Sequence, residues 1–349
     1  MKINHAILHV LDFLACENTF SHEEIDPTDK TAKNYVTRHA RKALANLDNK
    51  RGTFAPDSHF AERLRAYSAN QVGFVDLSAE IAEYFANELA HMEKSVSTDV
   101  LVVDFEADAD APADDPEAAF DGPVARYFAV MLLESKQAYV HEVDYGEIGE
   151  RIGIARHHAV LPNPSQKLSS YAVVDLRTLA VTFSDKKRTI AGGERWLIPD
   201  GLLQCSMEAS SKETFAAVAE IVEAVAEEYG HNATVALSRA KAYAVENAVE
   251  AASDDLDLDA MAEVAFESDP VMKERFEEAA RAVKLPERVP LEREAVRRVA
   301  RSQKIRTDTG IEVTFPAEYS RNPEYIVFTS EADGTISIQL RNISSIENR

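Results

Sequence analysis

Hydrophobic residues follow strand-like spacing in some parts of the chain and helix-like spacing in others. The apolar run from Ile3 to Phe13 is rich in β-branched and aromatic side chains, which favours an opening strand, with a short buried helix as the alternative. From Lys30 the period becomes helical, with an apolar stripe over residues 36–47. Two further helical stripes follow over residues 60–67 and 77–92, and Asp57 is expected to cap the first of them.

Strand patterns occupy the middle of the chain. Residues 99–105 are typical of a buried strand, and residues 171–183 supply at least one more. The apolar runs 126–133 and 137–143 are separated by three polar residues, which predicts a hairpin with a short loop. Residues 104–121 hold eight acidic residues and no Lys or Arg, a composition that predicts an exposed, mobile loop.

The last 140 or so residues are helical first and then β again. Helices are expected at 215–229 (ended by Gly230), at 233–252, at 257–266, after Asp269-Pro270 and from Pro290, and strands at 311–315, 325–329 and 335–340, the last two joined at Asp333-Gly334. This order predicts an α+β fold: an N-terminal mixed α/β part with an antiparallel sheet, then a helical segment and a C-terminal β-hairpin. We expect two domains, 1–208 and 209–349.

Composition narrows the class of protein. With 349 residues, 45% of them hydrophobic and 28% charged, the chain has the make-up of a globular protein. Its start lacks the pattern of a signal peptide, and no apolar run reaches the roughly 18 residues that a membrane span requires. Two cysteines, Cys16 and Cys205, are too few for a disulfide scaffold. We therefore expect a cytoplasmic protein that has no contact with membranes.

Catalytic and cofactor signatures are weak. His157 and His158 are adjacent, and adjacent strand residues point to opposite faces, which disfavours a shared metal ion. The glycines at 146, 149, 153, 192 and 193 do not form a phosphate-binding or dinucleotide-binding loop. A hydrolase or nuclease would need clustered carboxylates, and Asp99 and Asp104 are predicted to lie on opposite faces of one strand. We expect no enzymatic activity, no cofactor and no metal.

Charge is the most informative property of the sequence. The formal net charge is −22. Two stretches are basic nevertheless: residues 30–51 contain seven basic residues and one acidic residue, and residues 293–306 contain six basic residues and one acidic residue. Basic side chains at helical spacing can follow a phosphate backbone, and the alternative is that they pair with the many acids. The candidate DNA-binding residues are Arg38, Arg41, Lys42, Lys186, Lys187, Arg188, Arg297, Arg298, Arg301, Lys304 and Arg306.

Three stretches resemble one protein family. They are the opening Ile3-Asn4-His5-Ala6-Ile7-Leu8-His9-Val10-Leu11, the middle (127–133, 138–143, Arg195-Trp196 and 202–205), and the ending (310–315, 325–328 and 333–338). In this order they are similar to the bacterial nucleoid-associated proteins of the NdpA/YejK type, over nearly the whole chain. The resemblance implies a cytoplasmic protein that sits on the nucleoid and binds DNA without a known enzymatic activity. It assigns no DNA-contacting residues.

Three functional hypotheses follow from the sequence. The first is a nucleoid-associated protein that binds the backbone of double-stranded DNA largely independently of sequence, as a homo-oligomer whose repeated basic patches raise the affinity. The second is an acidic interaction module that engages protein partners with basic surfaces in DNA-processing or defence machinery. The third is the hydrolase considered above.

Overall fold

The fold was analysed in a computed structural model that describes residues 1–13, 15–92, 96–108, 124–146, 149–250, 255–290, 296, 300–330 and 336–345. Internal contacts divide the chain into two compact units, Met1–Glu208 and Ala209–Arg349. Each unit has its own hydrophobic core. The described part of the chain contains no helix that is long and apolar enough to cross a membrane.

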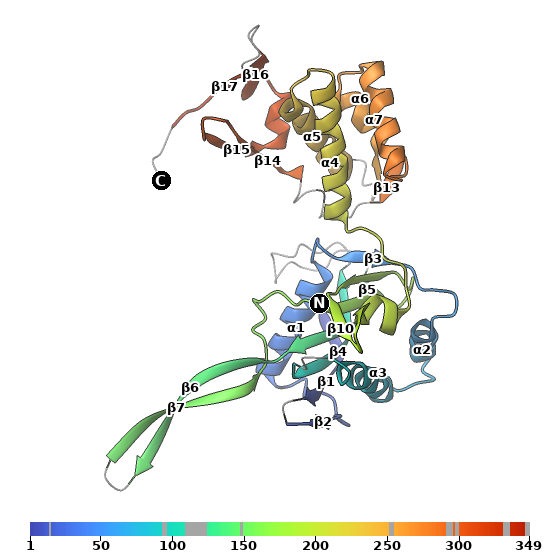
Figure 1. Cartoon of the computed structure of the whole chain (residues 1–349), viewed down its shortest axis with the longest axis vertical. Helices are drawn as coiled ribbons and strands as arrows, with labels where there is room; N and C mark the ends of the chain where they lie inside the picture. Colours follow the sequence, from blue (N-terminus) through green and yellow to red (C-terminus); the bar gives the residue numbers. More distant parts are fainter. Residues whose placement is uncertain are drawn as a thin grey trace. The chain divides into compact units, whose positions relative to one another are not determined.

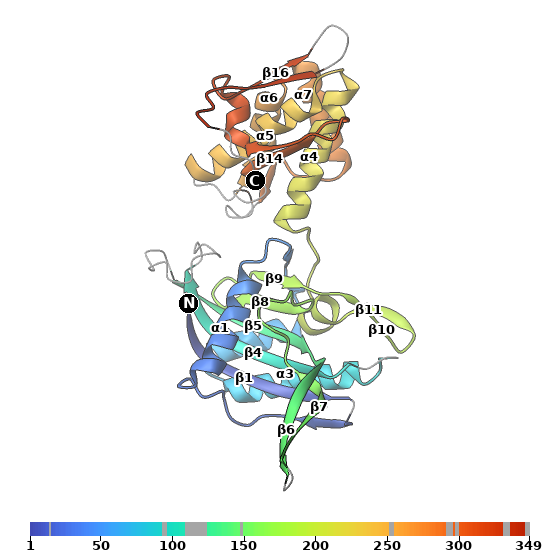
Figure 2. The same ribbon diagram turned by 90° about the vertical axis from the view of Figure 1, so that its left-hand side faces the viewer.

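Unit 1 is built on a seven-stranded antiparallel sheet with the strand order β2-β1-β4-β5-β8-β9-β3 (Figures 1 and 2). Its strands are β1 (Lys2–Asp12), β2 (Glu17–Thr19), β3 (Lys50–Gly52), β4 (Thr98–Asp108), β5 (Val124–Glu134), β8 (Tyr171–Asp175) and β9 (Val181–Ser184). The other elements of unit 1 are α1 (Lys30–Leu44), α2 (His59–Ser68), α3 (Phe74–Leu89), the arm strands β6 (Lys136–Gly146) and β7 (Gly149–Val160), the hairpin β10 (Lys187–Ile190) and β11 (Gly193–Trp196), and the π-helical turn η1 (Leu197–Leu203).

Both faces of the sheet are apolar and both are covered. Alternate residues of β4 supply the two faces: Val100 and Val102 belong to the core that includes α2, α3 and η1, whereas Leu101 and Val103 belong to the core that includes α1. All four side chains are at most 1% exposed. Because β4 lies inside the sheet and carries apolar residues on both sides, helices must pack on each face.

The helices of unit 1 begin where the sequence offers capping side chains. The side chain of Asp29 accepts hydrogen bonds from Thr31 N and Ala32 N and so caps α1. The cap of α2 is Ser58, whose hydroxyl accepts from Ala61 N and donates to Leu203 O, so the expected cap Asp57 is wrong by one residue. The serine is favoured because its hydroxyl satisfies both the helix end and a buried carbonyl of η1.

Two predictions about the middle of the chain were wrong. The run at 126–133 does not pair with the run at 137–143: β5 lies between β4 and β8, while β6 turns away and pairs with β7 alone. The predicted strand 99–105 and the predicted loop 104–121 overlapped, and β4 extends through residue 108, so residues 106–108 belong to the strand and not to a loop. Asp104 is fully buried. The other residues of the acidic segment, 109–121, lie outside the described residues.

Unit 2 is a helical layer followed by short antiparallel strands. It contains α4 (Ser211–Glu228), α5 (Ala233–Glu250), β12 (Asp255–Asp257), α6 (Leu258–Ala265), α7 (Pro270–Ala282), β13 (Arg288–Pro290), β14 (Ser302–Arg306), β15 (Glu312–Pro316), the 3-10 helix η2 (Ala317–Arg321), β16 (Ile326–Ser330) and β17 (Ile336–Leu340). The predicted caps are confirmed: Asp269 and Pro270 open α7, and Gly230 follows α4 at φ 72°. The 3-10 helix η2 packs on α5.

One predicted helix start in unit 2 was wrong, and one predicted turn falls outside the described residues. Pro290 ends the short strand β13 where a helix start was expected. The predicted turn residues Asp333 and Gly334 lie outside the described residues, but β16 and β17 do pair antiparallel. The overall α+β prediction, with an antiparallel sheet in the N-terminal half and a C-terminal strand pair, is confirmed.

The end of unit 1 depends on a glycine in β3. Residues 205–208 run beside β3, and a Cβ atom added to Gly52 would lie 2.5 Å from the carbonyl oxygen of Ser206 and 2.9 Å from the sulfur of Cys205. We therefore expect Gly52→Ala to lower the free energy of unfolding by about 1–3 kcal/mol in urea denaturation. Gly193→Ala is the matched control, since its nearest atom lies 3.8 Å away. Equal stability of the two variants would contradict this account.

Candidate nucleic-acid interface

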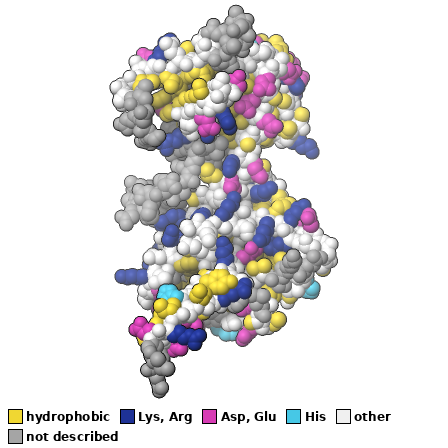
Figure 3. All heavy atoms as spheres, turned by 60° about the vertical axis from the view of Figure 1, so that its left-hand side comes forward, with side chains coloured by type: hydrophobic (Ala, Val, Ile, Leu, Met, Phe, Trp, Pro, Cys, Tyr) yellow, Lys and Arg dark blue, Asp and Glu magenta, His cyan; other side chains and the backbone are white. Residues whose placement is uncertain are grey.

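Helix α1 presents a basic surface on the side that faces away from the sheet. Its apolar residues Val36, Ala40 and Ala43 are buried against the sheet, which turns the opposite side of the helix to solvent. That outer side carries what we call the α1 basic face, and no acidic residue occurs anywhere in the helix. The α1 basic face consists of Lys30, Arg38, Arg41 and Lys42 on this outer side, together with Lys33, which is exposed at the N-terminal end of the helix. Lys and Arg side chains are conspicuous on unit 1 in the space-filling view (Figure 3).

Two arginines of the α1 basic face have no carboxylate partner among the described residues. Within the described ranges, neither Arg38 nor Arg41 forms an ion pair. The ammonium group of Lys42 donates to the carbonyl oxygens of Ser165 and Gln166, each at 2.7 Å. Carbonyl groups hold the side chain in place without cancelling its charge. Helix α1 itself therefore carries five basic side chains and no acidic one, although the protein as a whole is acidic.

A further lysine outside the helix lies next to the α1 basic face. The ammonium group of Lys136, at the start of β6, donates to the side-chain oxygen of Gln166 at 2.7 Å. Gln166 thus connects Lys136 with Lys42, whose ammonium group binds its backbone oxygen. Lys30, Lys33 and Lys136 were not among the candidate residues, although Lys30 and Lys33 lie in the same basic run of the sequence.

A buried histidine lies beneath the α1 basic face. His39 is fully buried and packs edge-on against Tyr35, with 4.5 Å between ring centroids. Burial lowers the pKa of His39 to about 4, and the charges of Lys42 and Arg38 act in the same direction. His39 is therefore neutral at physiological pH and adds no charge to the surface above it.

The cluster at 186–188 has a different environment. Lys186 pairs with Glu134 at 2.6 Å, and Lys187 pairs with Glu194 at 3.3 Å. Arg188 is only 5% exposed, and its guanidinium group binds the carboxylates of Asp185 and Glu134. These pairings fit a role in joining β10 to the end of β5, because a buried guanidinium group needs such partners.

Two basic residues that follow Arg301 lie on a strand. Lys304 and Arg306 belong to β14. Hydrogen bonding to β15 sets the conformation here and places Glu312 opposite Arg306, with its carboxylate 2.8 Å from Lys304. Arg301 is exposed. Arg297 and Arg298 lie outside the described residues.

The carboxylates considered for hydrolysis do not come together. Asp104 faces α2, where it accepts hydrogen bonds from the Tyr67 hydroxyl at 2.5 Å and from Arg126 at 2.6 Å. Asp99 lies on the other side of β4, where its charge acts on Tyr35 of α1. Across the described part of the chain, no group of three or more His, Cys, Asp or Glu side chains is arranged to hold a metal ion.

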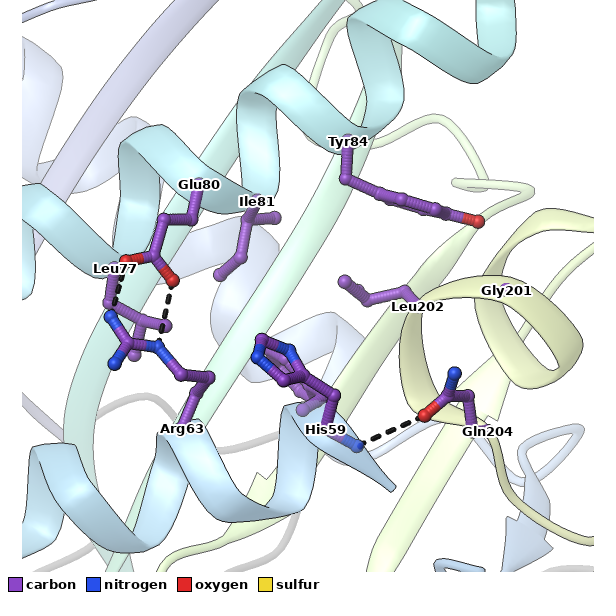
Figure 4. Close-up of a pocket in the computed structure, with 10 residues that line it drawn as sticks. His59, Arg63, Leu77, Glu80, Ile81, Tyr84, Gly201, Leu202 and Gln204 are labelled. Carbon is purple, nitrogen blue, oxygen red and sulfur yellow. Dashed lines mark hydrogen bonds and ion pairs between the residues drawn. The ribbon is translucent and has the colours of Figure 1, made fainter. Parts of the chain in front are cut away.

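A cleft of about 400 Å³ opens between α2, α3 and η1 (Figure 4). Its walls are mostly apolar, and an ion pair between Arg63 and Glu80 lies at one side. At the other side the Gln204 side chain accepts a hydrogen bond from His59 N at 3.0 Å. Burial raises the pKa of Tyr84 well above its ordinary value, so its hydroxyl stays protonated at physiological pH. The cleft thus combines apolar walls with a neutral hydroxyl group that can form hydrogen bonds.

Comparison with known proteins identifies the family. The family model described as nucleoid-associated protein YejK matches residues 7–347. The chain therefore belongs to this family of nucleoid-associated proteins, as the resemblance in the three sequence stretches indicated. No curated protein matches the chain.

Two buried groups, His39 of α1 and Asp99 of β4, give a testable pH dependence. Burial and the charge of Asp12 raise the pKa of Asp99 from 3.8 to about 6, while the pKa of His39 falls from 6.5 to about 4. Between pH 4 and 6 the folded chain keeps a proton on Asp99 that the unfolded chain has lost, so this group lowers stability as the pH rises. His39 acts oppositely, because the unfolded chain is the one that holds the proton.

Asp99 and His39 therefore have opposite effects on the free energy of unfolding between pH 4 and 6. We expect Asp99→Asn to make the free energy of unfolding rise more steeply from pH 4 to 6, by about 1.4 kcal/mol per pH unit relative to the unmodified protein. His39→Gln should change the slope in the opposite direction. Urea denaturation at pH 4.5, 5.2 and 6.0 would measure both slopes. Slopes that match the unmodified protein in both variants would show that these pKa values are not shifted.

Proposed function

We propose that this protein binds double-stranded DNA through the phosphate backbone, largely independently of base sequence, and that the α1 basic face is the main contact. Membership of a nucleoid-associated family supports a role at the nucleoid. The observation that carries the proposal is the absence of acidic residues from α1, together with the lack of ion pairs at Arg38 and Arg41 within the described residues. Such charges remain available to replace counterions on DNA.

The dimensions of the helix are suitable for this contact. From Lys30 to Lys42 the helix rises by about 18 Å, and phosphates along one DNA strand repeat about every 3.4 Å of helix axis. Several basic side chains can therefore reach phosphates of the same duplex. A helix whose inner face is fixed by the sheet core presents these side chains without further ordering of the backbone.

The other candidate residues contribute less in this proposal. Lys186, Lys187 and Lys304 already have carboxylate partners, and Arg188 is buried. A phosphate would have to compete with these carboxylates. Arg301 and Arg306, with Arg297 and Arg298, form a second proposed contact in unit 2.

We further propose that the protein acts by binding and not by catalysis, in the cytoplasm, as a homo-oligomer that repeats the basic surface. Repetition raises the effective affinity of a weak patch. A second candidate function is capture of proteins with basic surfaces, which the net charge of −22 favours.

The salt dependence of DNA binding tests the proposal. With about three phosphate contacts, the slope of log affinity against log salt concentration should be about −3 for the unmodified protein. We expect Arg38→Gln/Arg41→Gln to reduce the slope by about two and to weaken binding at least tenfold near 0.1 M salt, since each arginine removes one contact. Fluorescence anisotropy with two duplexes of unrelated sequence would measure both quantities.

Lys187→Gln/Lys304→Gln is the matched control, because it removes the same net charge at two residues that have carboxylate partners. It should bind almost as tightly as the unmodified protein. A control that loses as much affinity as the α1 variant would rule out α1 as the main contact. Binding that does not respond to salt would rule out backbone recognition altogether.

A further inference from the structure

The strands β6 and β7 form an arm that extends away from the body of unit 1 (Figures 1 and 2). They pair with each other from Lys136–Val160 at the base to Gly146–Gly149, and neither strand joins the seven-stranded sheet. A two-stranded hairpin alone is at best marginally stable in water. The arm therefore needs a partner surface to be firmly held.

One face of the arm is strongly apolar and open to solvent. Alternate side chains of a strand share a face, and this rule places five large apolar side chains together. They are Tyr139 (71% exposed), Val143 (41%), Tyr145 (77%), Ile152 (74%) and Ile154 (81%). We call this set, with the intervening His141, Glu150 and Arg156, the arm ladder. A contiguous apolar surface of this kind marks an interaction site.

The opposite face of the arm is different. It carries Glu142, Asp144 and Arg151 beside the smaller side chains Ala138, Val140 and Ala155. A DNA backbone is a poor partner for the arm, because Arg151 and Arg156 are outnumbered by the carboxylates of Glu142, Asp144 and Glu150. An apolar protein surface fits the arm ladder better than DNA does.

The arm ladder is complementary to itself. From the base outward its cross-strand pairs are Tyr139–Arg156, His141–Ile154, Val143–Ile152 and Tyr145–Glu150, which span about 20 Å. Placed face to face and antiparallel with a second copy, Ile154 meets Ile152 of the other arm, and Arg156 meets Glu150. At each end, Tyr139 of one arm meets Tyr145 of the other arm. Isologous dimers require this kind of self-complementary surface.

We propose that two copies of this chain dimerise by packing their arm ladders together in this antiparallel arrangement. This inference deepens the homo-oligomer part of the proposed function and rests on no claim about DNA. The central aliphatic pairs exclude water, and each end is closed by an Arg156–Glu150 contact between the copies. A parallel arrangement would leave Glu150 against the apolar face of Tyr145, so the charges select the antiparallel one.

Sedimentation equilibrium of the full chain without DNA tests the proposal. We expect a monomer–dimer equilibrium whose dissociation constant rises at least tenfold in Ile152→Ser/Ile154→Ser, because four aliphatic side chains per dimer lose their contacts. Both isoleucines are exposed in the single chain, so this variant should keep its fold, which circular dichroism would verify. Glu142→Ser/Asp144→Ser, on the reverse face, is the matched control and should dimerise like the unmodified protein.

A charge exchange tests the orientation. Arg156→Glu should weaken the dimer, and the double change Arg156→Glu/Glu150→Arg should restore it, since only an antiparallel pair brings these two residues together. A monomer at every concentration, or a dimer indifferent to the isoleucine variant, would overturn the proposal. Failure of the exchange to restore the dimer would overturn the antiparallel arrangement. Each result stands whether or not the protein binds DNA.

Discussion

The seven-stranded sheet has apolar side chains on both of its faces, and the rest of unit 1 follows from the need to cover them. Val100 and Val102 require α2, α3 and η1 on one side, while Leu101 and Val103 require α1 on the other. Once α1 is held by its apolar stripe, its polar side must face solvent. The position of the basic surface is therefore a consequence of core packing, and the absence of acids from that helix sets its sign.

A protein with a net charge of −22 can bind a polyanion only if its charges are segregated, because long-range repulsion opposes the approach. The structure shows two ways of using basic residues. At 186–188 and at Lys304 they are held by carboxylates and stabilise local structure, whereas Arg38, Arg41 and Lys42 keep their charge without a described carboxylate partner. Helix α1 thus carries basic and no acidic side chains, and salt screening limits the repulsion from distant acids.

Elements with strong periodicity could be predicted from the sequence, including β1, α1 and the capped helix α7. What failed was pairing between strands. The short polar linker after β5 fits a hairpin, but β5 gains two sheet neighbours in β4 and β8, and this leaves β6 to pair with β7. Local sequence cannot rank such competing long-range pairings. Likewise, only pairing with β15 shows that Lys304 and Arg306 lie on a strand. The exposure of Tyr139, Val143 and Tyr145 could not be predicted either, because the apolar run 137–143 is equally typical of a strand inside a sheet.

Chemical protection of lysines tests the central claim that the outer side of α1 meets DNA. Lysines would be acetylated in the free protein and in the presence of excess duplex DNA, and the modified sites quantified by mass spectrometry. Lys30 and Lys33 are exposed in the free protein. The account predicts that DNA reduces acetylation of Lys30, Lys33 and Lys42 while Lys187 reacts equally in both samples. Protection of Lys187 with unchanged reactivity along α1 would contradict it.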